Sequence, residues 1–155
     1  MTPFVPLSTY NPTNPFGQYD PKYYPRAKHH IGSDFRIPVG TPIVAPLDGE
    51  MFKTSVSASK GNVGIYIFEH EGMLWGLELC HLKELPPLGK FREGQRIAFS
   101  GNTGSATTGP HLHAVMHRDA KVTRNYSELV NEEAFVRLWR EGRIIDTYLW
   151  MWQRV

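Results

Sequence analysis

Residues 63–81 read VGIYIFEHEGMLWGLELCH, and this stretch decides the fold. Alternate residues from Val63 to Ile67 are apolar and β-branched, which is the period of a half-buried strand. His70-Glu71-Gly72 predicts a turn, and Met73 to His81 reads as the partner strand. We therefore expect an antiparallel hairpin near the middle of the chain.

Outward from this hairpin, short apolar runs alternate with turns. The chain has 12 prolines and 14 glycines, which are scattered instead of forming one tract. The pattern predicts strands near residues 42–46, 50–57, 96–100 and 111–117 and loops over 82–89, 91–95 and 101–110. We expect a mainly β protein, an antiparallel sheet or open barrel with loops that wall a groove.

The two ends of the chain differ from this pattern. Residues 1–28 are rich in Pro, Tyr and Asn and predict an irregular arm that packs as part of the domain. Residues 131–140 predict one short helix with Asn131 as its N-cap. The apolar run 144–152 predicts a last strand or a packed tail. We expect one domain over residues 1–155, with a core at about 15–120.

Composition excludes several classes of protein. The net charge of +2 is too small to predict a nucleic-acid partner. The single cysteine, Cys80, cannot form an intramolecular disulfide. No run approaches the roughly 18 apolar residues of a membrane span, and MTPFVPLSTY lacks a signal-peptide pattern. We expect a monomer that binds neither nucleic acid nor membrane.

Two short runs predict a zinc site. His111 and His113 are two apart on a predicted strand, so both imidazoles share one face. His30 and Asp34 are four apart in an extended segment, which again gives one face. Imidazole nitrogen and carboxylate oxygen both bind zinc, and catalytic zinc usually keeps three protein ligands. His30, Asp34 and one histidine of the pair supply that number. His29 is the alternative to His30, but the spacing to Gly32 and Asp34 favours His30.

The remaining candidates have plainer interpretations. Cys80 precedes His81, but neighbours on a strand face opposite ways, which predicts a buried, inert thiol. We expect His29 and His70 to be exposed. His117 shares strand parity with His113 and is interpreted as structural or close to the substrate.

Taken in order, the motifs resemble the lysostaphin/LytM family of zinc endopeptidases. The resemblance covers roughly residues 15–117. The matching motifs are Pro15-Phe16-Gly17, His30-x-Gly32-x-Asp34, Val39-Gly40-Thr41-Pro42, Asp48-Gly49, His81-Leu82, Gly101-Asn102-Thr103-Gly104 and Gly109-Pro110-His111-Leu112-His113.

This resemblance implies the fold called the duplicated hybrid motif and a role for each residue. His30, Asp34 and His113 would bind one Zn²⁺, and His81 and His111 would be the catalytic histidines that do not bind it. Tyr24 matches a tyrosine thought to steady the oxyanion in some members. The family usually has an aromatic residue where this chain has Leu79, which puts substrate preference in doubt.

The resemblance also implies a function, a zinc endopeptidase that cleaves peptide cross-links of bacterial peptidoglycan. The bond is left open between glycine bridges and D-amino-acid cross-links. With no export signal seen, we expect a phage endolysin or virion-associated enzyme that reaches the periplasmic or extracellular wall through a holin or in the virion. The alternative is a non-catalytic wall-binding or hydrolase-activating scaffold, although such scaffolds typically lose residues that are all present here.

Overall fold

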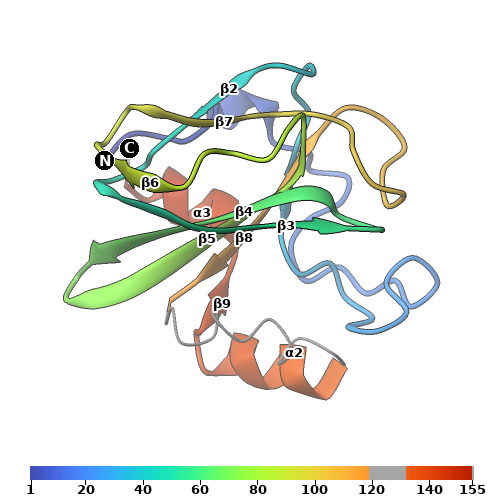
Figure 1. The fold of residues 1–155 in the computed structure, drawn as a ribbon. Helices are drawn as coiled ribbons and strands as arrows, with labels where there is room; N and C mark the ends of the chain where they lie inside the picture. The colour runs from blue at the N-terminus through green and yellow to red at the C-terminus, as the bar shows by residue number, and fades with distance from the viewer. Residues whose placement is uncertain (119–131, 155) are drawn as a thin grey trace.

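A computed structural model of the chain gives the fold, with residues 1–118 and 132–154 described (Figure 1). Within these residues the main sheet has seven strands, all paired antiparallel, in the order β1-β8-β5-β4-β3-β6, with β9 beside β8. The strands are β1 (Ser33–Phe35), β3 (Gly49–Ser57), β4 (Gly61–His70), β5 (Met73–Leu82), β6 (Gly89–Phe91), β8 (Leu112–His117) and β9 (Ile144–Ile145). A second sheet pairs β2 (Pro42–Val44) with β7 (Arg96–Phe99). The mainly β prediction is confirmed, with open sheets and no closed barrel among the described strands.

The predicted central hairpin is confirmed as β4 and β5. Its register pairs His70 with Met73, and the two residues between them, Glu71 and Gly72, both have positive φ. Two consecutive positive φ angles suit the right-handed twist of a tight hairpin. The indole of Trp75 donates to the carbonyl of His70 at 2.9 Å, which ties the turn to its own strand.

Alternation along β8 separates the core from the opposite face of the sheet. Leu112, Ala114 and Met116 are fully buried in the main hydrophobic cluster with Tyr66, Leu77 and Leu79. His113 and His117 occupy the alternate positions and therefore lie on the other face. The same strand thus supplies both packing and polar side chains.

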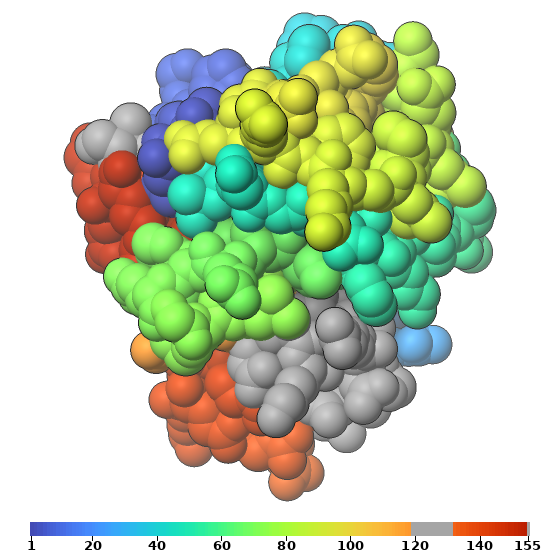
Figure 2. All heavy atoms as spheres, turned by 60° about the vertical axis from the view of Figure 1, so that its left-hand side comes forward, coloured from blue at the N-terminus to red at the C-terminus, as the bar shows by residue number. Residues whose placement is uncertain are grey.

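The N-terminal arm packs against the sheet, as expected. It contains a short 3-10 helix, η1 (Leu7–Thr9), and Phe4 and Val5 are buried in the main cluster. Backbone bonds from Val44 to Phe4 (3.1 Å) and from Asn11 to Asp34 (2.8 Å) fix the arm along β2 and β1. Figure 2 shows the N-terminal residues (blue) between the C-terminal helix (red) and the segment near residue 95 (yellow).

The predicted helix is confirmed as α2 (Glu132–Arg140), with Phe135 and Leu138 buried. Its predicted N-cap, Asn131, lies outside the described residues. Of the two alternatives for residues 144–152, the packed tail is confirmed, because Trp150 and Met151 are buried in the main cluster. The strand is limited to β9 (Ile144–Ile145), and helix α3 (Thr147–Trp152) follows it. Asp146 starts α3, since its carboxylate accepts from the N–H groups of Tyr148 and Leu149.

The three aromatic residues of α3 differ in their exposure and contacts. Tyr148, Trp150 and Trp152 alternate in sequence, but Trp150 is buried and Trp152 is exposed, so they do not share one face. Tyr148 instead stacks on Tyr10 of the arm, with centroids 3.9 Å apart. No helix among the described residues is long and apolar enough to cross a membrane.

Candidate metal centre

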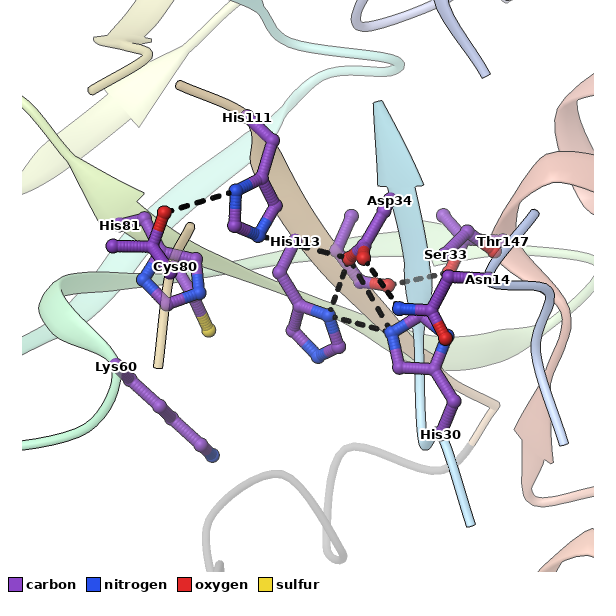
Figure 3. Close-up of polar contacts among 12 residues, drawn as sticks. Asn14, His30, Ser33, Asp34, Lys60, Cys80, His81, His111, His113 and Thr147 are labelled. Carbon is purple, nitrogen blue, oxygen red and sulfur yellow. Dashed lines mark hydrogen bonds and ion pairs between the residues drawn. The ribbon is translucent and has the colours of Figure 1, made fainter. Parts of the chain in front are cut away.

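Three side chains from two distant segments of the sequence converge in one place (Figure 3). His30 Nε2 lies 3.1 Å from His113 Nδ1 and 3.3 Å from Asp34 Oδ1, and His113 Nδ1 lies 2.9 Å from the same oxygen. Zinc bonds of about 2.0–2.1 Å in a tetrahedron place ligand atoms roughly 3.3 Å apart. The three donor atoms therefore fit around one zinc ion with a position left open.

Strand pairing produces this convergence. Asp34 on β1 lies opposite His113 on β8, and Gly32 lies just before β1. A Cβ added to Gly32 would fall 2.5 Å from the carbonyl oxygen of Ala114 and 2.8 Å from the His113 ring. Position 32 must be glycine because the His113 ring occupies that space, which explains the middle residue of the His-x-Gly-x-Asp motif.

The protonation states of these groups suit a cation. Burial alone would raise the pKa of Asp34, but its polar contacts with His113 and His30 and the attraction of their positive charge, when these rings are protonated, outweigh burial and hold the pKa well below its usual range. Burial lowers the pKa of His113. A carboxylate and neutral imidazoles are the forms in which these residues bind metals.

His81 and His111 lie beside this centre, with ring centroids 4.6 Å apart. His111 Nε2 is 4.0 Å from Asp34 Oδ1. His81 Nδ1 lies 2.8 Å from the carbonyl oxygen of Thr103, and His111 Nδ1 lies 2.9 Å from that of Gly109. A carbonyl can only accept, so each neutral ring carries its proton on Nδ1 and keeps a lone pair on Nε2. Burial lowers the pKa of His81 to about 4, so the ring is neutral at neutral pH.

The loop 101–110 orients both histidines, and sequence reasoning missed its role. Thr103 donates through Oγ1 to the Leu82 carbonyl at 2.7 Å and accepts there from the N–H of Asn62 at 3.0 Å. These bonds hold the Thr103 carbonyl beside His81. The Gly-Asn-Thr-Gly motif was the available signal, but it named no contact.

The other predicted residues lie as follows. Tyr24 stacks on His30 with centroids 5.3 Å apart, and its hydroxyl bonds to Asn14. His29 lies apart from the three donor atoms, beside Gly17 and Glu132, and is partly buried where we expected exposure. His70 is likewise partly buried.

Cys80 and His117 are buried residues of the same sheet. The Cys80 thiol donates to Glu78 at 3.1 Å, and burial raises its pKa, so the prediction of a buried thiol is confirmed. The supporting argument from strand alternation does not extend to His81, because φ of His81 is 60° and leaves the extended conformation.

A groove of about 1320 Å³ runs past the centre. It is lined by the side chains of the metal site, by His81 and His111, and by Tyr24. Its walls also carry the cationic side chains of Arg26, Arg36, Lys53 and Lys60 and the acidic side chains of Asp20 and Glu78. Lys60 and Glu78 form an ion pair at 2.9 Å, so the remaining lining charge is mainly positive.

Sequence comparison gives one family. The model of peptidase family M23 matches residues 28–125. An uncharacterized metalloprotease of Haemophilus influenzae is 42% identical over 94 residues, 59% of this chain and 19% of that protein. Peptidoglycan DD-endopeptidase ShyA of Vibrio cholerae is 41% identical over 90 residues, 57% of this chain and 20% of that protein. The chain thus spans about a fifth of the length of these relatives.

Solved structures agree with the sequence comparison. The catalytic domain of lysostaphin from Staphylococcus simulans has a TM-score of 0.58 at 28% identity, over 72% of this chain and 82% of that chain. A zinc-containing peptidase from Vibrio cholerae has a TM-score of 0.53 at 29% identity, over 70% of this chain and 31% of that chain.

Proposed function

This chain belongs to peptidase family M23, and from that premise we propose that it is a zinc-dependent endopeptidase that cleaves peptides of bacterial peptidoglycan. The observation that carries the proposal is the set of three donor atoms at 2.9–3.3 Å beside two histidines whose Nδ1 atoms donate to backbone carbonyls. His30, Asp34 and His113 would hold the ion. When bound, zinc supplies Lewis acidity, which activates water and polarises a carbonyl group.

The residues of the chain supply the proton transfers. Nε2 of His111 lies 4.0 Å from Asp34 Oδ1 and takes the proton of the attacking water. The imidazolium so formed returns a proton to the leaving amine. His81, whose ring is tilted against that of His111 at a centroid distance of 4.6 Å, is the second proton carrier.

Tyr24 supplies an O–H donor on the same groove. Burial raises the pKa of its phenol, so the hydroxyl keeps its proton. We propose that this hydroxyl turns from Asn14 to the tetrahedral oxyanion as negative charge develops there.

The charge of the groove favours one class of cross-link. Apart from the proposed ligand Asp34 and the Lys60–Glu78 pair, the charged residues lining the groove are the cations Arg26, Arg36 and Lys53 and the single anion Asp20. Stem peptides carry free carboxylates, whereas glycine bridges are uncharged along their length. We therefore propose direct cross-links between stem peptides as the substrate, in agreement with the DD-endopeptidase name of the ShyA relative.

The test is digestion of two purified walls, one with direct diaminopimelate cross-links and one with pentaglycine bridges. Mass spectrometry of the fragments identifies the bond cleaved, and metal analysis gives the zinc content. We expect one zinc per chain and cleavage of the direct cross-link. If the folded, zinc-loaded protein cleaves neither wall, the endopeptidase proposal is overturned and the scaffold alternative is favoured.

A charge reversal tests the substrate class. Lys53→Glu should raise KM for the stem-peptide substrate with little change in kcat, because Lys53 is exposed on the groove wall. Lys90→Glu makes the same charge change outside this groove and serves as the control. Equal KM values for the two variants would contradict the charge argument.

The lysis role expected from the sequence stays a prediction. Co-expression with a holin in a host with direct cross-links tests it, because a phage-type enzyme then lyses the cells from within. Intact cells despite an active purified protein would contradict it.

A further inference from the structure

The N-terminal arm contacts two of the three candidate zinc ligands through adjacent residues. Asn14 Nδ2 donates to Asp34 Oδ2 at 2.8 Å (Figure 3). The carbonyl oxygen of Pro15 accepts from His30 Nδ1 at 3.2 Å. Both residues precede the segment 28–125 that the family model matches, and Pro15 begins the Pro15-Phe16-Gly17 motif named above.

We propose that Asn14 and Pro15 are positioning residues of the metal centre, and this rests on the proposed zinc site. Asn14 holds the second oxygen of Asp34, so that Asp34 binds metal through Oδ1 alone. Pro15 fixes the tautomer of His30, so that Nε2 keeps the lone pair that binds metal.

The two oxygens of Asp34 face different partners. Oδ1 lies 2.9 Å from His113 Nδ1 and 3.3 Å from His30 Nε2, inside the donor set. Oδ2 lies on the other side and meets the amide of Asn14. A carboxylate without such a partner is free to rotate and bind a metal through both oxygens. The amide therefore limits the coordination number and preserves the open position that catalysis requires.

An amide suits this role for an electrostatic reason. Asn14 brings a hydrogen-bond donor without a charge, so it orients the carboxylate without competing with the ion for negative charge. Its other bonds, to the Tyr24 hydroxyl at 2.9 Å and 3.2 Å, hold the amide in this orientation. The side chain thus joins a metal ligand to the proposed oxyanion donor.

The backbone of the arm holds these two residues in place. Gly17 donates to the carbonyl of His30 at 2.7 Å, and His30 donates to that of Gln18 at 2.9 Å. Asn11 donates to the carbonyl of Asp34 at 2.8 Å. The arm is therefore fixed to both ligand residues on either side of the Asn14–Pro15 pair.

The test compares zinc affinity in Asn14→Ala and Asn14→Leu, of which the second keeps the side-chain volume. Partners of metal ligands typically contribute about 10- to 100-fold in affinity, and we expect a loss in that range by competition with a chromophoric chelator. Thr13→Ala is the matched control, because Thr13 lies next to Asn14 in the arm and, among the described residues, its side chain bonds to Asn11 and Arg36 and to none of the proposed ligands.

A cobalt-substituted protein gives a second readout that loss of packing would not produce. Tetrahedral cobalt absorbs visible light more strongly than five-coordinate cobalt. We expect weaker visible absorption in both Asn14 variants, because Asp34 then binds through two oxygens, and an unchanged spectrum in Thr13→Ala.

Wild-type affinity and an unchanged cobalt spectrum in both folded Asn14 variants would overturn the positioning role. A wild-type chain that binds no zinc would overturn it together with the metal centre. Neither readout depends on catalytic turnover. A chain that binds zinc but cleaves no wall would therefore contradict the proposed function and leave the positioning role intact.

Discussion

Nε2 of His30 lies 3.1 Å from Nδ1 of His113, although 83 residues separate the two in the sequence. His30 Nε2 carries a lone pair when its Nδ1 proton is held by the Pro15 carbonyl, and His113 Nδ1 carries one in the neutral tautomer with its proton on Nε2. The ionised carboxylate of Asp34 lies against both atoms. Three electron-pair donors at this separation repel unless a proton or a cation lies among them. An ion bound among the three atoms should therefore contribute to the stability of the folded chain.

Removal of the metal should lower the unfolding temperature. A ligand at 100 times its Kd stabilises the folded state by about 2.7 kcal/mol, so we expect a shift of several degrees on adding a chelator. Differential scanning fluorimetry with and without chelator measures it. His113→Ala, which removes one donor, should show no chelator effect. A wild-type curve that the chelator leaves unmoved would exclude a tightly bound ion.

His81→Ala should abolish cleavage without releasing zinc. The residue contributes a proton carrier and no metal donor, and a positioned acid or base contributes about 10²- to 10⁴-fold. We expect kcat to fall by that factor with the zinc content unchanged. His70→Ala is the control, since His70 lies at the β4–β5 turn outside the groove. Undiminished turnover in His81→Ala would remove His81 from the mechanism.

Tyr24→Phe should lower kcat and leave KM and zinc content nearly unchanged. An oxyanion donor acts only in the transition state, and its loss typically costs about 10²-fold or more. The Asn14 amide loses its two bonds to Tyr24 in this variant but keeps its 2.8 Å bond to Asp34, so we expect the metal ligands to stay in place. Tyr23→Phe removes a neighbouring hydroxyl from a side chain that is half exposed and serves as the control. Equal kcat values for the two variants would disprove the oxyanion role.

Sequence periodicity predicted most of the strands because they follow rules local to each segment. The β4–β5 hairpin combines alternating β-branched residues with a turn that suits positive φ. The short strand β6 was interpreted as loop and turn, because Gly89–Phe91 has no internal alternation and is defined by its pairing with β3.

The candidate site was predictable in its residue types but not in the contacts that orient them. His30, Asp34 and His113 could be named from spacing and family resemblance. Asn14, Pro15 and the Thr103 carbonyl could not, because each acts through a contact between segments far apart in the sequence. A backbone carbonyl, moreover, carries no residue-type signal.

Acid should destabilise the zinc-free protein. Burial lowers the pKa of His117 to about 4, against opposing attraction from Glu78 and with added repulsion from Lys60 and Arg143. Burial likewise lowers that of His81 to about 4. The unfolded chain takes up protons below pH 6.5 while these folded rings stay neutral. Stability is therefore full above pH 6.5 and is lost as the pH falls toward 4.

Each such histidine contributes a slope of up to about 1.4 kcal/mol per pH unit in that window. Urea unfolding in chelator at several pH values measures the slope. His117→Gln should reduce it, because glutamine does not titrate. A variant with the wild-type slope would show that His117 contributes nothing to the acid sensitivity.

Asp146→Ala should destabilise the fold through helix α3. The Asp146 carboxylate accepts from the N–H groups of Tyr148 at 2.9 Å and Leu149 at 3.2 Å, and from the hydroxyl of Ser33 at 3.0 Å. Loss of an N-cap costs about 0.5–2 kcal/mol, and Ser33 on β1 loses a partner as well. We expect the free energy of unfolding, measured by urea denaturation, to fall by an amount at or above that range.

Asp146→Asn separates the cap from the charge, because asparagine caps helices about as well. We expect it to retain most of the wild-type stability. Since Ser33 precedes the ligand Asp34, the alanine variant should also weaken zinc binding more than Asp146→Asn does. Wild-type stability in Asp146→Ala would mean that packing of Trp150 and Met151 alone determines where α3 begins.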